Sequence, residues 1–178
     1  MRGSTERSPS AAAPRRGGEA VPTHQYLRFA LGNEDFALPI ESVREILELG
    51  ELTPVPLMPS FLRGVMNLRG AVVPVIDLSS RFEFGDTVVT RRSCIVVVEL
   101  PGSEPATRVL GALVDSVSEV VDIGADCIEP TPSIGTRIAA AFIRGMARLP
   151  NRIVMVLDLP KVLDAADLDR LVSQHAAH

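Results

Sequence analysis

Apolar residues in this chain occur mostly in short runs, and the spacing within each run indicates which element it forms. In residues 26–32, Leu27, Phe29 and Leu31 alternate with smaller or polar residues, which predicts a strand with one buried face. Runs of Val, Ile and Leu bounded by Gly, Pro, Asn or Asp predict further strands at residues 36–38, 64–68, 71–78, 93–100, 108–115, 142–149 and 152–159. Because no amphipathic helices separate these runs, the pattern favours an antiparallel barrel or sandwich over a parallel sheet with crossover helices.

Two segments have helical rather than alternating spacing. Four apolar residues of segment 40–49 fall on one face of a helix, which predicts a short helix or a helical turn. The apolar residues of segment 160–174 also have near-helical spacing, so we expect a terminal helix packed on the sheets. Residues 1–22 are rich in Ser, Ala, Pro, Gly and Arg and have almost no large apolar side chains. They are predicted to be a disordered tail, which leaves residues 23–175 as the folded domain.

Part of the sequence occurs twice. The segment IESVREIL (40–47) aligns with VDSVSEVV (114–121), and FLRGVMNL (61–68) aligns with FIRGMARL (142–149). Both copies keep one order: a strand, an acidic-Ser-Val turn, a Pro-rich link, F-x-R-G, a hairpin and V-x-D-L. This order predicts a duplicated β unit. One unit is small for an independent core, so we expect two units packed together, with or without an exchange of strands.

The duplication helps to separate features of the fold from features available for function. Asp77 and Asp158 both end a V-x-D-L strand, where an aspartate can accept backbone N–H groups as a helix cap or in a turn. Because both copies contain this aspartate, a structural role is predicted for it.

The two hairpins differ at their tips. Gly70 and Asn151 occupy equivalent positions, and both residue types tolerate the positive φ that a two-residue turn requires. Arg69, beside Gly70, is replaced by Pro150 in the second copy, so such a turn does not need an arginine. Two interpretations of Arg69 stay open: a solvated turn residue, or a side chain available to a partner.

Composition narrows the function classes. The chain has 178 residues, 46% of them hydrophobic and 4% aromatic, and a net charge of −4, which disfavours nucleic-acid binding. Cys94 and Cys127 lie far apart without CxxC spacing and are interpreted as reduced thiols, while a disulfide stays open. With no secretory signal and no apolar run of ~20 residues, we expect a cytoplasmic protein without direct membrane insertion.

Residue patterns typical of catalysis are missing. The histidines, His24, His175 and His178, lie near the ends of the chain, away from any nucleophile or carboxylate with catalytic spacing. There is no metal-ligand spacing and no phosphate-binding glycine motif, so neither an enzyme nor a cofactor is expected. One alternative is a response-regulator-like phosphoacceptor at Asp77, which ends a hydrophobic strand. The lack of alternating helices and the equivalent aspartate in the second copy both weigh against this alternative.

Four segments in this order resemble the CheW-like domain of bacterial chemotaxis coupling proteins. They are QYLRFALGNEDFALPIESVREI (25–46), FLRGVMNLRGAVVPVIDL (61–78), GALVDSVSEVVDI (111–123) and FIRGMARLPNRIVMVLDL (142–159), and the resemblance extends from about residue 24 to residue 170. It implies a mainly β fold of two intertwined five-stranded antiparallel β-barrels, SH3-like and internally duplicated, with short helices and a C-terminal helix. This implied fold agrees with the duplicated β units inferred from the sequence.

The resemblance also implies a function. Such proteins are non-catalytic adaptors that join the cytoplasmic tips of methyl-accepting chemoreceptors to the regulatory domain of a CheA-type histidine kinase. The kinase domain is similar in fold, so a pseudo-symmetric contact between related barrels is expected. The resemblance therefore implies a cytoplasmic protein recruited to membrane-associated receptor arrays. Whether such an array controls flagella, pili or another output stays open.

The receptor-facing positions that the resemblance implies are Val43, Glu45 and Arg69, with Arg63 and Asn67 nearby. Val43 and Glu45 have counterparts in the second copy, and Arg63 recurs there too, whereas Arg69 has no counterpart and is the strongest candidate. We predict that the SVREI segment lies near the hairpin tip. Glu45 and Arg69 would then form an ion pair beside the receptor-binding groove, where a bidentate arginine fixes geometry.

Overall fold

The structure is a computed structural model of the chain and describes residues 22–101, 107–130 and 140–163. The tail predicted for residues 1–22 lies outside the described residues except for Pro22, which precedes the first strand. The terminal helix predicted for residues 160–174 also lies mostly outside them. Its described beginning forms one helical turn together with Leu159.

Strands dominate the described residues, as the apolar runs predict. The strands are β1 (Thr23–Leu31), β2 (Glu34–Pro39), β3 (Val43–Glu48), β4 (Leu62–Leu68), β5 (Ala71–Asp77), β6 (Cys94–Pro101), β7 (Thr107–Val114), β8 (Ser116–Gly124), β9 (Ile128–Glu129), β10 (Ile143–Leu149) and β11 (Arg152–Leu157). The short helical segments are η1 (Ile40–Ser42), α1 (Leu78–Arg81), η2 (Ala125–Cys127), η3 (Ala140–Phe142) and α2 (Leu159–Val162).

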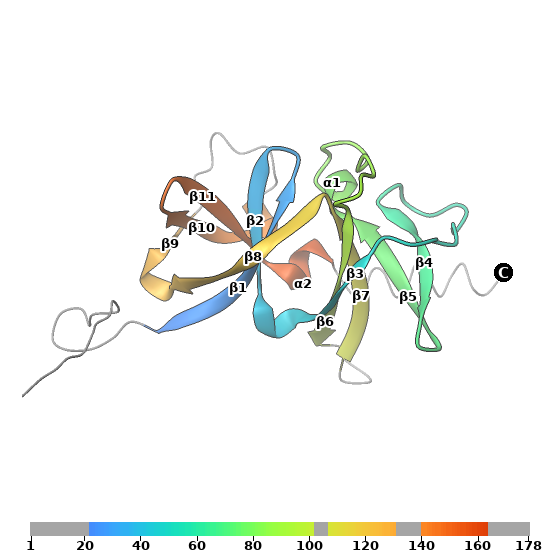
Figure 1. Cartoon of the computed structure of the whole chain (residues 1–178), viewed down its shortest axis with the longest axis horizontal. Helices are drawn as coiled ribbons and strands as arrows, with labels where there is room; N and C mark the ends of the chain where they lie inside the picture. The colour runs from blue at the N-terminus through green and yellow to red at the C-terminus, as the bar shows by residue number, and fades with distance from the viewer. Residues whose placement is uncertain (1–21, 102–106, 131–139, 164–178) are drawn as a thin grey trace, which may run out of the picture.

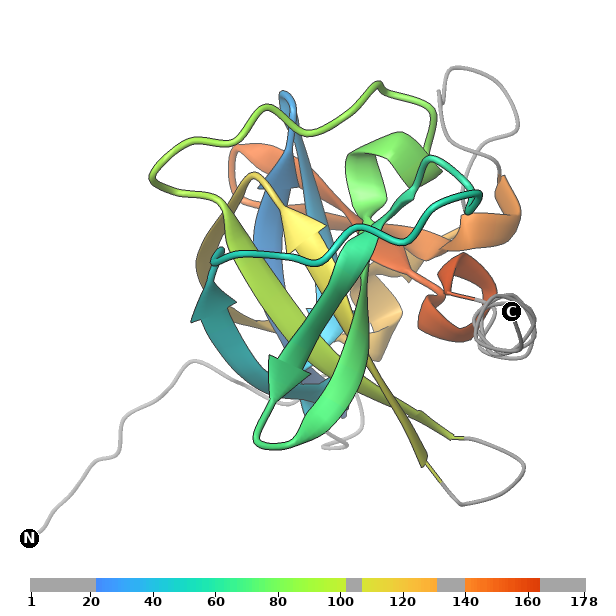
Figure 2. The ribbon, with the colours of Figure 1, turned by 90° about the vertical axis from the view of Figure 1, so that its right-hand side faces the viewer.

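These strands form two sheets that lie side by side (Figure 1). The first sheet has the order β3-β6-β7-β5-β4, and the second sheet has the order β8-β1-β2-β11-β10-β9. Figure 2 looks onto the first sheet and shows the β4–β5 hairpin ending in a free tip. The mainly β, duplicated architecture expected from the sequence is therefore confirmed.

The two copies exchange their first hairpins. The β1–β2 hairpin belongs to the first copy but lies in the second sheet, beside β8 and β11. The β6–β7 hairpin belongs to the second copy but lies in the first sheet, beside β3 and β5. Strand β2 of the first hairpin pairs with β11 in parallel, and strand β7 of the other hairpin pairs with β5 in parallel. Each sheet therefore has one parallel pairing where the sequence predicts antiparallel strands.

The glycine of F-x-R-G allows the segment that precedes each motif to pass close along the outer edge of the hairpin, beside β4 in the first copy and beside β10 in the second. In the first sheet, Thr53 forms a β-bridge with Val65 of β4, and in the second sheet β9 pairs with β10. A Cβ on Gly64 would lie 2.7 Å from the carbonyl oxygen of Thr53, and one on Gly145 would lie 2.8 Å from that of Glu129. Because these distances are too short for any side chain, the motif is repeated for reasons of fold.

The main core lies between the two sheets. It contains Phe29 and Phe36 from the exchanged hairpin together with Leu78 and Leu159 from the two short helices. Two smaller clusters lie on the opposite face of each sheet from the main core, one around Tyr26 and Val156 in the second sheet and one around Val97 and Leu113 in the first. Exchange of hairpins therefore places each copy's apolar residues in the other copy's core.

The helix predicted for residues 40–49 is limited to η1, and the residues after it form strand β3. Glu45, Ile46 and Leu47 pair with β6, and Val43 is β-branched, which favours a strand in a paired edge position. The helical spacing of the apolar residues was thus overridden by tertiary strand pairing. Both cysteines are free, as predicted, and Cys94 is partly buried while Cys127 is exposed.

Candidate partner-binding site

Glu45 and Arg69 form a bidentate ion pair, as the sequence predicts. Arg69 Nη1 lies 2.5 Å from Glu45 Oε2, and Arg69 Nη2 lies 2.9 Å from Glu45 Oε1. Glu45 is on β3 and Arg69 follows β4, and these are the two edge strands of the first sheet. The pair therefore joins opposite edges of one sheet. The side chain of Arg69 is 69% exposed, so its outer surface is accessible to a partner.

The turn that carries Arg69 is set by its backbone conformation. Arg69 and Gly70 have φ values of 53° and 89°, which is the type I′ geometry of a two-residue hairpin. Asn67 Oδ1 accepts a 3.0 Å hydrogen bond from the Gly70 N–H and thereby supports the turn. Arginine is uncommon at positive φ, so the choice of Arg69 here favours a role for its side chain.

The second hairpin makes a different turn with the same number of residues. Asn151 has a φ of 70°, and Pro150 before it is restricted to negative φ by its ring. This combination is typical of a type II turn. The second copy therefore turns without a charged side chain at its tip, and it offers no equivalent of Arg69.

The ion pair changes the proton affinity of both partners. The hydrogen bond from Arg69 lowers the pKa of Glu45 below its ordinary value, partial desolvation opposes this, and the positive charges of Arg69 and Arg44 add to the lowering. The same hydrogen bond raises the pKa of Arg69. Both groups are therefore charged at neutral pH. Since the pair is exposed to solvent, its contribution to folding stability is small, and its effect is mainly on side-chain orientation.

Val43 and Arg63 are placed differently from the exposed pair. Val43 is partly buried and packs against the main core, opposite Val98 of β6. Arg63 is at the other end of β4 from the hairpin tip, and its Nη1 lies 2.7 Å from Asp77 Oδ2. The structure thus brings Glu45 of β3 to Arg69 beyond β4, with Asn67 in the same hairpin turn as Arg69, while Arg63 makes a separate contact.

Asp77 is at the centre of a buried polar network. Its carboxylate is 1% exposed and accepts hydrogen bonds from Arg63, the Ser80 N–H, and both the N–H and the Oγ1 of Thr87. The contact with Ser80 is the N-cap of α1, so the cap predicted for this aspartate is confirmed. Burial and saturation of the carboxylate oxygens disfavour the phosphoacceptor alternative.

Asp158, the counterpart of Asp77, lacks this network. It makes no side-chain cap hydrogen bond, and its Oδ2 lies 4.0 Å from Lys161 Nζ. Of the two predicted caps, only the first is made by the side chain. The same residue type therefore has two different environments in the two copies.

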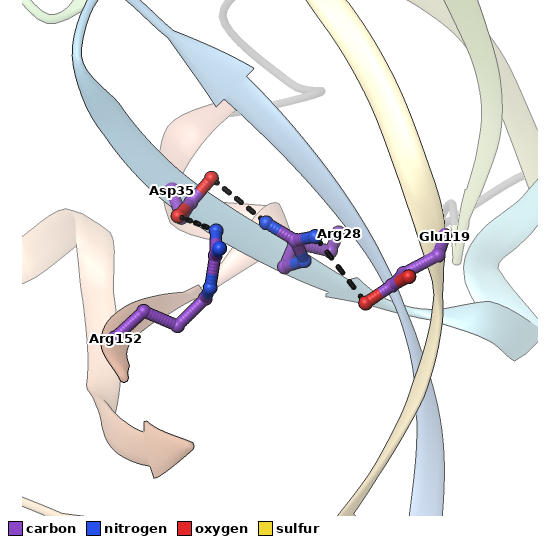
Figure 3. Close-up of polar contacts among 4 residues, drawn as sticks. All are labelled: Arg28, Asp35, Glu119 and Arg152. Carbon is purple, nitrogen blue, oxygen red and sulfur yellow. Dashed lines mark hydrogen bonds and ion pairs between the residues drawn. The ribbon is translucent and has the colours of Figure 1, made fainter. Parts of the chain in front are cut away.

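An ion-pair network on the second sheet was not predicted from the sequence (Figure 3). Arg28 Nη2 lies 3.2 Å from Glu119, the counterpart of Glu45, and Arg28 Nη1 lies 3.2 Å from Asp35. Arg152 Nη1 lies 2.8 Å from the other oxygen of Asp35. The four residues come from β8, β1, β2 and β11, so only strand pairing brings them together. The one signal in the sequence was the alignment of Glu45 with Glu119.

Exposed apolar side chains also occur at equivalent positions in the two copies. Ile46 of β3 is 42% exposed and its counterpart, Val120 of β8, is 47% exposed. Val72 of β5 and its counterpart, Ile153 of β11, are 67% and 48% exposed. The edge strands β3 and β8 thus each present an acidic residue in an ion pair next to an exposed β-branched residue.

Neither a metal site nor a membrane-spanning helix is found in residues 22–101, 107–130 and 140–163. No group of three or more His, Cys, Asp or Glu side chains there is arranged to hold a metal ion. No helix in these ranges is long and apolar enough to cross a bilayer.

Comparison with known proteins identifies the family. The CheW-like domain model matches residues 25–167. The chemotaxis protein CheW of Klebsiella aerogenes is 30% identical over 168 residues, covering 93% of this chain and 98% of that protein. The chemotaxis protein CheW of Rhizobium meliloti is 33% identical over 143 residues, covering 80% and 89%.

A solved structure has the same fold. The scaffolding protein TtCheW from Thermoanaerobacter tengcongensis superposes with a TM-score of 0.72 at 33% identity, covering 80% of this chain and 94% of that protein. The residues that the family model matches contain both copies of the repeat, from within β1 to α2. The chain therefore belongs to the CheW-like domain family.

Proposed function

We propose that this protein couples the cytoplasmic tips of methyl-accepting chemoreceptors to the regulatory domain of a CheA-type histidine kinase. A non-catalytic adaptor role in chemotaxis follows from membership of the CheW-like family. The identity of the partners and the surfaces that bind them are the proposal. In this role the protein is cytoplasmic and is recruited to receptor arrays at the membrane.

The observation that carries the receptor contact is the Glu45–Arg69 pair. Its arginine is held in a fixed direction by two hydrogen bonds, and it stands on a hairpin tip that is otherwise free. A pre-oriented arginine at an exposed position is typical of the residues that dominate protein interfaces. Asn67 lies in the same hairpin turn as Arg69 and is exposed, and Ile46, which follows Glu45 on β3, exposes an apolar side chain on the other face of that strand. We assign this edge of the first sheet to the receptor.

The kinase contact is proposed at the equivalent edge of the second sheet. Strand β8 is an edge strand like β3, and it exposes Val120 next to Glu119. An exposed edge strand is a surface on which a second β domain can dock. A duplicated adaptor with two similar edges can thus hold two partners at once, one on each copy.

The test is a reconstituted mixture of receptor fragments, a CheA-type kinase and this protein. We expect kinase activity to respond to receptors only when the protein is present, and each partner to bind it separately. Val120→Lys should weaken binding of the kinase regulatory domain, whereas Ile46→Lys, its counterpart, should weaken receptor binding. A folded protein that binds neither partner would overturn the proposal. If both substitutions weakened binding of the same partner, the assignment of the β3 edge to the receptor and of the β8 edge to the kinase would be wrong.

A further inference from the structure

Arg81, the last residue of α1, contacts both copies of the repeated sequence. Its guanidinium carbon lies 4.9 Å from the centre of the Phe61 ring and 4.7 Å from the centre of the Phe142 ring. Both distances are within the ~6 Å range of a cation–π interaction. Arg81 Nε also donates a 2.9 Å hydrogen bond to the carbonyl oxygen of Val162 in α2.

The partners of Arg81 are related by the duplication. Phe61 and Phe142 are the phenylalanines of the two F-x-R-G motifs, and Val162 is the counterpart of Arg81 itself. The contact therefore lies where the two copies face each other. Val162 is apolar and fully buried, so at this pair of positions only the first copy contributes a cation.

Each phenylalanine is attached to the hairpin that follows it. The Phe61 carbonyl accepts a 2.7 Å hydrogen bond from the Asp77 N–H, and the Phe142 carbonyl accepts one of 2.9 Å from the Asp158 N–H. Phe142 also packs on Phe82, with ring centres 5.6 Å apart. Because the rings are fixed in this way, a shift of either hairpin base must change a contact of Arg81.

We propose that Arg81 is a positioning residue that sets the orientation of the first sheet relative to the second. Its guanidinium holds the base of the β4–β5 hairpin against the base of the β10–β11 hairpin through one ring from each. An aliphatic side chain of similar length fills the space but makes neither the cation–π contacts nor the hydrogen bond to Val162. The apolar core alone then leaves more freedom between the sheets.

The consequence for signalling rests on the proposed function. Receptor and kinase are assigned to different sheets, so the angle between the sheets sets the geometry in which the two partners meet. Loss of the Arg81 contacts leaves each separate binding surface intact and weakens only the control of kinase by receptor. The orientation itself can be measured without either partner, so failure of this inference is distinguishable from failure of the proposed function.

The experiment measures the distance between spin labels on the two sheets by pulsed electron paramagnetic resonance. Cys94 and Cys127 are first replaced by Ser, and labels are attached through Val72→Cys and Ile153→Cys, which are exposed counterparts on β5 and β11. Arg81→Met should broaden and shift the distance distribution, and Arg81→Lys, which keeps the cation, should restore most of it. Arg44→Met is the matched control, because Arg44 makes only a surface ion pair with Glu99.

A double-mutant cycle provides the second readout. Phe142→Leu should raise the unfolding equilibrium constant several-fold more in the Arg81 background than in the Arg81→Met background, because the pair is coupled. If Arg81→Met does not fold, Phe61→Leu makes the same label test, since it leaves the bond to Val162 and the Phe142 ring in place. An unchanged distance distribution in a folded Arg81→Met or Phe61→Leu protein would overturn the inference.

Discussion

Glu45 and Glu119 occupy equivalent positions in the two copies, yet each pairs with an arginine from a different element. Glu45 binds Arg69 at the tip of a hairpin, whereas Glu119 binds Arg28 on the neighbouring strand. The side chain of Arg69 is 69% exposed and that of Arg28 is 12% exposed, so only the first pair presents its arginine to a partner. The glutamate is thus present in both copies, but the arginine that it binds is accessible in the first copy and largely inaccessible in the second.

Arg69→Ala should leave the fold intact and weaken receptor binding. The arginine is exposed and its removal opens no cavity, so the thermal midpoint should change little. A well-placed interface arginine is often worth about tenfold or more in affinity. Receptor-dependent kinase activity and circular dichroism are the measurements, and Arg148→Ala is the matched control, because Arg148 is a similarly exposed, ion-paired arginine on the second sheet. Normal coupling by a folded Arg69→Ala protein would remove Arg69 from the site.

Exchange of the charges of Glu45 and Arg69 should distinguish an orienting role of the ion pair from direct contact of either side chain with the receptor. Glu45→Arg alone places two like charges together, so it should disrupt the hairpin tip and weaken receptor coupling. Addition of Arg69→Glu restores opposite charges and should recover part of the activity. If the double variant stays as weak as the single one, both residues remain candidate contacts but the pair has no role of its own.

The pKa of Glu45 should depend on Arg69. The pKa is lowered in the folded protein, so the pair's stabilising effect is present above the ordinary glutamate pKa and is lost as pH falls through the lowered value. Titration of the Glu45 carboxyl by NMR should show a higher pKa in Arg69→Ala. Arg44→Ala should have a smaller effect, because its charge contributes least. Equal shifts in the two variants would contradict the assignment of the hydrogen bond as the main cause.

Asp77→Asn should destabilise the protein, whereas Asp158→Asn should not. Asp77 is buried and accepts four hydrogen bonds, one of them from Arg63, and loss of its charge should cost about 2 kcal/mol of unfolding free energy. Asp158 has only a distant lysine contact. Denaturant unfolding measures both. Incubation with phosphorylated kinase should leave the wild-type protein unlabelled, and stable label that Asp77→Asn abolishes would revive the phosphoacceptor alternative.

Gly64→Ala should destabilise the first sheet by about 1–3 kcal/mol, because the added Cβ would lie 2.7 Å from the Thr53 carbonyl oxygen. Gly145→Ala should have a similar effect for the equivalent reason. Gly50→Ala is the control, since a Cβ there meets nothing within 4 Å. Urea midpoints give the comparison. Equal midpoints for Gly64→Ala and Gly50→Ala would show that the crossing chain moves away without cost.

The sequence by itself predicted the duplication and eight of the eleven described strands, all except β3, β8 and β9. Strand positions were predictable because alternating and β-branched runs are local signals, and the hairpin tips because few residues accept positive φ. The duplication aligned equivalent residues and exposed Arg69 as a residue that the turn did not require. The resemblance to the CheW-like family supplied the pairing with Glu45, and the structure confirms it.

Tertiary structure alone decided which strands pair across the two copies and which partners Glu119 and Arg81 contact. Residues 43–48 have helical spacing but form β3, because pairing with β6 satisfies their backbone groups and outweighs local preference. The residue pattern left the exchange of hairpins open, since both arrangements bury the same apolar residues, and only the family resemblance implied intertwined barrels. The exchange then places Arg28 beside Glu119, and the packing of the two copies places Arg81 between Phe61 and Phe142. These residues are far apart in sequence, and only packing of the two copies brings their charges and rings into contact.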